Sequence, residues 1–183
     1  MGVALFDVGA GCTSEAPGQA LSALTTNTGS SEPAGTSAVQ SDSSFEEELA
    51  NVLPCEVLDD GQIIELGFDP ATADFADFGV VYMCSYTVAP LETPLLSINI
   101  DRDVPMGELN LSDYNLAEHQ VGPLRALLIT DDREENKCQI SMDLGESAHA
   151  TVVVSFTESR EAACESAERV AQVLEPELPR EAR

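Results

Sequence analysis

The chain has 183 residues, which is enough for one domain of ordinary size and a tail. Its 33 acidic residues outnumber 8 basic ones, so the formal net charge is −25, and such a surface repels nucleic-acid phosphates. We therefore expect no nucleic-acid partner, and because the acids are spread along the chain we attribute them to solubility rather than to one cation site.

The first long segment after residue 12 is polar. Residues 13–44 are poor in large apolar side chains and rich in Ser, Thr, Gly, Ala and Pro. Such a segment cannot bury enough apolar surface to offset the entropy lost when a chain becomes ordered. We interpret residues 13–44 as a flexible, disordered tether, followed by a single α+β domain at residues 45–183.

Two short helices are expected at the start of the domain. The first precedes Pro54, a residue that ends helices. The second follows Asp59, which forms a capping-box pattern with Gln62 three residues later, and Gly67 is suited to end it. The side chains that we expect these helices to bury are Phe45, Leu49, Val52, Ile63, Ile64 and Leu66.

Strands are expected to follow. Residues 80–88 and 95–100 are rich in β-branched and aromatic side chains and predict a hairpin, whose turn holds Pro90 and Pro94. The next segment, LSDYNLAEHQ, is interpreted as helical, with Ser112 as its cap. Three further strands of an antiparallel meander are predicted by RALLIT, KCQISMDL and ATVVVSFT.

The last element is a helix over residues 159–176, which Ser159 can cap and Pro176 can close. Apolar residues recur at helical spacing on one face, at Ala163, Ala167, Val170, Val173 and Leu174. Together the elements predict an α+β fold, in which an antiparallel sheet of about five strands packs against helices as a sandwich.

The domain also contains four of the chain's five cysteines: Cys55, Cys84, Cys138 and Cys164. Zinc sites use close pairs such as Cys-x-x-Cys, which are absent from the sequence. A catalytic thiol needs a histidine in reach, and both His119 and His149 fall in predicted loops without a supporting motif. We favour two disulfides, and hence an oxidising compartment. Four cysteines allow three pairings, and our guess is Cys55 with Cys84 and Cys138 with Cys164.

The fifth cysteine, Cys12, follows small residues and precedes the polar tether. Ala10-Gly11-Cys12 matches the end of a bacterial lipoprotein signal, which is cut just before a cysteine that receives lipid. Met1–Gly11 lacks basic residues and is short for such a signal. Either the true start lies upstream or Cys12 is accidental. We favour the first alternative, so residues 1–12 are the remnant of a lipoprotein signal and Cys12 is the predicted site of lipidation.

The cysteine pattern resembles a known family. LPCEVLDDGQIIELGFDP resembles the opening of the actinobacterial lipoproteins called domain of unknown function 3558, in which a Pro-Cys precedes a short helix that ends near Gly-Phe. A strand Cys-x-Trp follows in that family, and this chain has Tyr86 in place of the Trp. The family then has a further strand cysteine, as in KCQISMDL, and a cysteine-bearing helix that ends with Leu-Pro. The resemblance covers residues 50–180. It implies an exported protein, anchored by lipid at the cell surface or secreted, and no established activity.

Other charged and aromatic residues have simple structural interpretations. Asp101 and Asp103 lack the additional oxygen ligands and the glycine of a calcium loop. Arg133 lies among acids in a hydrophilic turn, for which weak cation binding is the alternative. Tyr82 and Tyr86 are interpreted as half-buried packing groups, with the lining of a ligand groove as the alternative. We therefore predict no metal ligand, no cofactor and no catalytic residue.

The preferred functional hypothesis is a non-enzymatic binding or sensing domain, tethered to the membrane by its lipid. Its ligand is unknown, and an envelope protein, a lipid or a glycan are the classes considered. The first alternative is a cell-envelope hydrolase with an unrecognised site, using His119 or His149 with a nearby acid. The second is a structural spacer of the envelope without a ligand.

Overall fold

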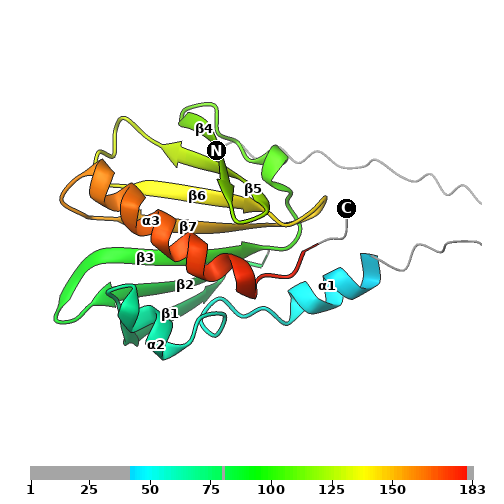
Figure 1. Cartoon of the computed structure of the whole chain (residues 1–183), viewed down its shortest axis with the longest axis horizontal. Coiled ribbons are helices and arrows are strands. Elements are labelled where there is room, and N and C mark those ends of the chain that lie inside the picture. The colour runs from blue at the N-terminus through cyan, green and yellow to red at the C-terminus, as the bar shows by residue number, and fades with distance from the viewer. Residues whose placement is uncertain (1–41, 80, 181–183) are drawn as a thin grey trace, which may run out of the picture. The chain divides into compact units, whose positions relative to one another are not determined.

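The computed structural model describes residues 42–79 and 81–180 (Figure 1). Cys12, the expected signal remnant and nearly all of the expected tether therefore lie outside the described residues. Helix α1 begins at Asp42, slightly before Phe45, where we expected the domain to start. The described elements all belong to one compact unit.

The elements alternate little between helix and strand along the chain. The helices are α1 (Asp42–Ala50), α2 (Asp60–Glu65) and α3 (Arg160–Leu174), with two 3₁₀ turns, η1 (Met106–Glu108) and η2 (Glu175–Glu177). The strands are β1 (Asp69–Asp77), β2 (Val81–Val88), β3 (Leu91–Asp101), β4 (Asn115–Val121), β5 (Leu124–Thr130), β6 (Cys138–Asp143) and β7 (His149–Ser155).

These strands form one open antiparallel sheet in the order β1-β2-β3-β7-β6-β5-β4. The α+β class is confirmed. The expected five strands are wrong, because the sheet has seven, and the described residues form a single sheet with helices rather than a sandwich. The long connection from β3 to β4 lets β7 insert beside β3, so the two halves of the sheet are joined by the β3–β7 pair.

Two segments were assigned wrongly from the sequence. Residues 111–120 contain most of strand β4 rather than a helix, and Ser112 caps no helix. Gly122 and Pro123 form a two-residue turn to β5, with Gly122 at φ 54°, a conformation that favours glycine. Strand β3 begins at Leu91 and includes Pro94, so the preceding turn is shorter than we expected.

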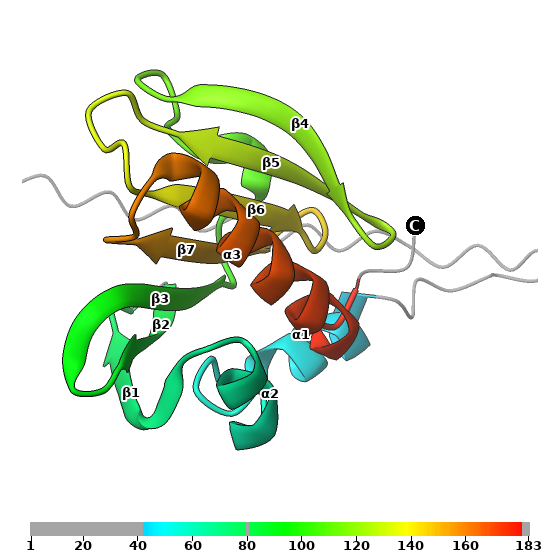
Figure 2. The same cartoon turned by 60° about the vertical axis from the view of Figure 1, so that its left-hand side comes forward.

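One face of the sheet carries the apolar core. Cys84, Ile98, Val152 and Ile140 are paired in a row across four strands, and each is fully buried. Helix α3 lies over this row on β6 and β7, as Figures 1 and 2 show. Its apolar face buries the expected residues except Val173, which is only partly buried, and the buried set is Ala163, Ala167, Val170, Ala171 and Leu174.

The two N-terminal helices cover the other half of the same core. The capping box of α2 is confirmed, because the backbone N–H of Gln62 donates to Asp59 Oδ1 and that of Asp59 donates to Gln62 Oε1, both at 2.8 Å. Phe45, Leu49, Ile63 and Leu66 are buried, whereas Val52 is partly buried. The prediction for Ile64 is wrong: its side chain is 61% exposed, because the single inward face of this six-residue helix is occupied by its neighbours.

Both disulfides lie on the core face. Cys55, between α1 and α2, is bonded to Cys84 in β2, and Cys138 at the start of β6 is bonded to Cys164 in α3. These are the pairings that we guessed from the sequence. Each bond joins a segment of the helical layer to the sheet, so the two layers are linked covalently in both halves of the domain.

Candidate functional site

A polar groove lies at one end of the sheet, next to the start of α3. It has a volume of about 830 Å³, within the range of small-molecule sites. One wall is the loop between β5 and β6, and the other is the segment that connects β7 to α3. The lining residues are Asp132, Arg133, Glu134, Glu135, Asn136, Thr157, Glu158, Ser159, Arg160 and Glu161. A hollow of about 440 Å³ shares Asp132 and Arg133 with it and extends to residues 112–115.

The first wall is held in shape by Asp131. Its carboxylate accepts hydrogen bonds from Nε of Arg133 at 2.9 Å, from Nη2 at 2.7 Å and from the Arg133 backbone N–H at 2.9 Å. The side-chain bonds from Arg133, followed by its backbone bond, lower the pKa of Asp131 from 3.8 to about 2. The carboxylate is therefore ionised at neutral pH, and its bonds to Arg133 hold the loop in this conformation.

The second wall is the first turn of α3. Ser159 Oγ accepts a hydrogen bond from the Ala162 N–H at 3.2 Å and caps the helix, as the sequence predicts. Arg160 reaches across the groove, where Nη2 donates to the Asp131 carbonyl at 2.8 Å and Nη1 lies 3.6 Å from Asp132 Oδ1. Thr157 donates its backbone N–H to the carbonyl of Asn136 at 3.4 Å.

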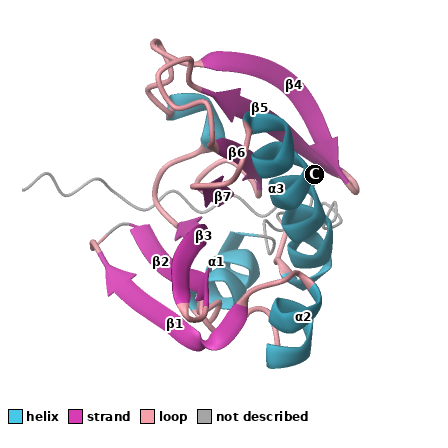
Figure 3. Ribbon diagram, turned by 90° about the vertical axis from the view of Figure 1, so that its left-hand side faces the viewer, coloured by secondary structure: helices cyan, strands magenta, loops and turns pink. Residues whose placement is uncertain are grey.

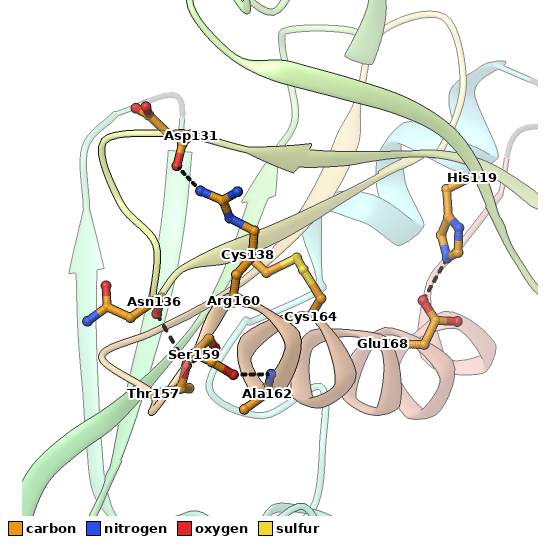
Figure 4. Close-up of a disulfide and its surroundings, with 10 residues drawn as sticks. All are labelled: His119, Asp131, Asn136, Cys138, Thr157, Ser159, Arg160, Ala162, Cys164 and Glu168. Carbon is orange, nitrogen blue, oxygen red and sulfur yellow. Dashed lines mark hydrogen bonds and ion pairs between the residues drawn. A yellow bond between two sulfur atoms is a disulfide. The ribbon is translucent and has the colours of Figure 1, made fainter.

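The disulfide between Cys138 and Cys164 joins the two walls. Figure 4 shows this bond next to the contacts that Arg160 and Thr157 make with the opposite loop. Cys138 follows directly after the loop, and Cys164 lies one turn into α3, so the bond fixes the distance between the walls. A binding surface that is set on rigid elements in this way loses little entropy when a ligand binds.

The groove attracts cations rather than anions. Its lining has five carboxylates and two arginines, and both arginines already contact Asp131 or Asp132. Glu134 is 2.8 Å from the ammonium of Lys137. Within the described part of the chain, the other three carboxylates, Glu135, Glu158 and Glu161, have no hydrogen bond or ion pair. All three are exposed, so each is accessible to positive charge on a ligand.

An exposed aromatic side chain stands next to the groove. Phe156, which precedes the lining residue Thr157, is 56% exposed and has φ 60°, the left-handed region that non-glycine residues seldom adopt. This conformation holds a large apolar side chain at the surface beside the groove.

Both histidines lie in strands, so their assignment to loops is wrong. His119 is in β4, and its Nε2 is 2.6 Å from Oε2 of Glu168 in α3, whose other oxygen accepts a bond from Gln172 at 2.8 Å. His149 begins β7, is 5% exposed, and has its Nδ1 2.7 Å from the carbonyl of Val104. Neither histidine lines the groove or the hollow beside it.

Tyr82 and Tyr86 both serve packing. Tyr86 is 2% exposed and donates its hydroxyl to the carbonyl of Cys55 at 3.2 Å. Burial raises the pKa of Tyr86, and the negative charge of Asp60 raises it further. Tyr82 is covered by the guanidinium of Arg102, 4.0 Å above the ring centroid.

The acidic pair Asp101 and Asp103 forms a turn after β3. Asp101 Oδ1 accepts the backbone N–H groups of Asp103 at 3.2 Å and of Val104 at 3.0 Å, so this carboxylate serves local structure. Among residues 42–79 and 81–180, no group of three or more His, Cys, Asp or Glu side chains is arranged to hold a metal ion. None of the helices in these ranges is long and apolar enough to cross a membrane.

A match to a family model places nearly the whole described domain in a known family. The model of the family described as Protein of unknown function (DUF3558) matches residues 8–177. The chain belongs to this family. The DUF3558 match includes Cys12 and all four disulfide cysteines, in agreement with the resemblance drawn from cysteine placement. No curated protein matches the chain, and no solved structure does either.

Sequence reasoning missed the groove of this DUF3558 protein. Residues 131–135 were interpreted as a hydrophilic turn, and the opposite wall at residues 157–161 is distant in the sequence. The guessed bond from Cys138 to Cys164 is the signal that could have located the groove, because it brings the end of one loop to the first turns of the last helix.

Proposed function

We propose that the chain is an exported protein, held at the cell surface by lipid on Cys12, whose domain binds a partner without catalysing a reaction. The observation that carries this proposal is the disulfide pair. Two bonds use four of the five cysteines, and such bonds persist in oxidising compartments. Cys12 is left over, ahead of a polar segment, and the family match reaches back to include it.

The binding role is supported by the groove. Its walls are fixed by a disulfide, its carboxylates lack partners at three positions, and Phe156 stands exposed beside it. These features suit a ligand with positively charged groups and an apolar part. Among the ligand classes considered from the sequence, a protein of the envelope with basic side chains fits this charge best.

The test is the intact mass of the protein isolated from its native host, with and without reduction. We expect a mass increase from acyl chains that the Cys12→Ser variant lacks. Alkylation of the acylated protein should add no label before reduction and four labels after reduction. An unacylated protein with four free thiols in the domain would contradict the proposal.

The hydrolase alternative has one contact in its favour, the His119–Glu168 pair at 2.6 Å, because an acid beside a histidine is the arrangement of a general base. The test compares hydrolysis of p-nitrophenyl esters by the wild type and by His119→Gln. A rate above buffer that the substitution abolishes would favour the hydrolase, and equal rates at the buffer level would favour the binding role.

A further inference from the structure

The two edges of the sheet differ in how they are protected. The β1 edge has Pro70, the three aspartates Asp69, Asp74 and Asp77, and a break in register with β2 between Asp69 and Asp74. Proline, charge and irregular pairing are the features that prevent an edge strand from accepting another strand. The β1 edge is therefore closed.

The β4 edge has none of these protections except one glutamate. Asn115–Val121 pairs with Leu124–Thr130 without a shift in register. Since Val121 and Leu124 flank a two-residue turn, they form a hydrogen-bonded pair, and the bonded residues alternate from there. Leu116, Glu118 and Gln120 consequently direct their N–H and C=O groups away from β5, and all three residues are exposed.

Acidic side chains of α3 lie beside this edge. Glu161, Glu165 and Glu168 follow one another at spacings of four and three residues, so they share one face of the helix. Glu168 contacts His119 of β4, which shows that this face is turned toward β4 (Figure 4). Figure 3 shows β4 as the outermost strand with α3 beneath it. We call these three residues the acidic stripe.

The edge and the acidic stripe both lead to the groove. Asn115, the first residue of β4, donates its side-chain N–H to Asp132 Oδ1 of the groove at 2.9 Å. Glu161, the first residue of the stripe, is itself a lining residue. The open edge, the stripe and the groove thus form one acidic surface with unpaired backbone groups along it.

We propose that β4 accepts an extended basic segment of a partner protein as an added strand, with Lys or Arg side chains against the acidic stripe. Backbone hydrogen bonds to residues 116, 118 and 120 would supply affinity, and the carboxylates would select for positive charge. The proposal rests on the proposed function for its binding role. A second copy of this chain is disfavoured as the occupant, because it would bring a charge of −25 to a surface of the same sign.

The probe is a fluorescein-labelled peptide, Lys-Val-Lys-Thr-Lys-Val-Lys, with a Glu-for-Lys version as its control. Binding to the full chain is measured by fluorescence anisotropy at low and high salt. We expect saturable binding of the Lys peptide only, weakened by salt because charge pairs contribute. Failure of the Lys peptide to bind, or equal binding of both peptides, would overturn the proposal.

Two pairs of variants locate the site. Glu118→Pro removes an outward N–H that β5 does not use, whereas Glu118→Gln removes the same charge and keeps the N–H. Glu161→Lys with Glu165→Lys reverses the stripe, and Glu47→Lys with Glu48→Lys makes the same charge change on exposed residues of α1. We expect Glu118→Pro and the stripe variant to weaken binding at least tenfold relative to their controls, with all four variants checked for folding by circular dichroism.

If the α1 variant weakened peptide binding as much as the stripe variant, net charge alone would explain the loss, and the proposal would be overturned. Sedimentation of the full chain tests the other occupant: a dimer that Glu118→Pro dissociates would show that a second copy covers β4. The two proposals can fail separately. If the peptide does not bind, the acylation and thiol counts still test the proposed function. If the protein is unacylated and has free thiols, the peptide experiments still test strand addition at β4.

Discussion

Gly122, in the turn between β4 and β5, packs directly against the carboxylate of Glu175 at the end of α3. A Cβ at position 122 would overlap that carboxylate, and the backbone there has φ 54°. Glu175 is itself buried and pairs with Arg180. The hairpin that presents the open edge is thus seated against the end of the last helix.

Gly122→Ala should therefore destabilise the fold. The left-handed backbone conformation costs a non-glycine residue about 1–2 kcal/mol, and displacement of Glu175 adds to that figure. The measurement is the urea midpoint. Gly107→Ala is the matched control, since a Cβ at that glycine meets no atom within 4 Å and should change stability little. Equal midpoints for the two variants would contradict the packing described here.

Loss of the bond between β6 and α3 should weaken the domain substantially. For cysteines 26 residues apart, the chain-entropy relation gives about 3.5 kcal/mol for the disulfide. Cys138→Ala with Cys164→Ala should lower the free energy of unfolding in urea by that order, and Cys12→Ala is the control that should leave it unchanged. An unaffected unfolding midpoint in the double variant would show that the bond does not stabilise the fold.

Asp131 should make stability depend on pH. Its pKa of about 2 in the folded protein lies below the value of about 3.9 for an unfolded aspartate. The ionised carboxylate therefore stabilises the fold above about pH 4, and this contribution is lost as the pH falls toward 2. Asp131→Asn should be less stable than the wild type at pH 7, with the difference shrinking by pH 2.5, as urea unfolding at both pH values would show.

Arg133→Met serves as the control for that result, because it removes the partner that lowers the pKa of Asp131. It should abolish the stabilisation by ionised Asp131 that the wild type loses as the pH falls toward 2. A stability difference between the wild type and Asp131→Asn that stays constant from pH 7 to pH 2.5 would contradict the assignment.

Removal of the helix cap at the groove should lower the free energy of unfolding by about 1 kcal/mol, the usual value for a Ser→Ala change at an N-cap. Ser159→Ala leaves the Ala162 N–H without its acceptor. The check is thermal unfolding, and Ser166→Ala within α3 is the control, since alanine is favoured inside helices. A Ser166→Ala variant that is equally destabilised would argue against a capping role for Ser159.

The elements that sequence reasoning identified are those with strong local signals. The capping box of Asp59 and Gln62, and the apolar spacing of α3, depend on residues a few positions apart, and both are present in the structure. The pairing of the cysteines was a guess among three possibilities, and the structure has the guessed bonds, from Cys55 between α1 and α2 to β2 and from β6 to α3.

The edge strands were missed because they are exposed on both faces. β1, with the sequence DPATADFAD, has no fully buried residue, and β4 has only Val121. Alternation of apolar and polar residues marks a strand only when one face is buried, so neither segment shows it. The strand at 115–121 is set instead by pairing with β5 through the Gly122-Pro123 turn, and the groove depends on contacts across long sequence separations.

The unequal edges restrict growth of the sheet to one side of this domain. If both edges of a domain could accept a strand from another copy, the copies could polymerise into open-ended fibres, because each added copy would expose a new edge. Here Pro70 and the irregular start of β1 stop growth on one side. A strand added at β4 would therefore lengthen the sheet on that side alone, because the β1 edge of the same domain resists a further strand.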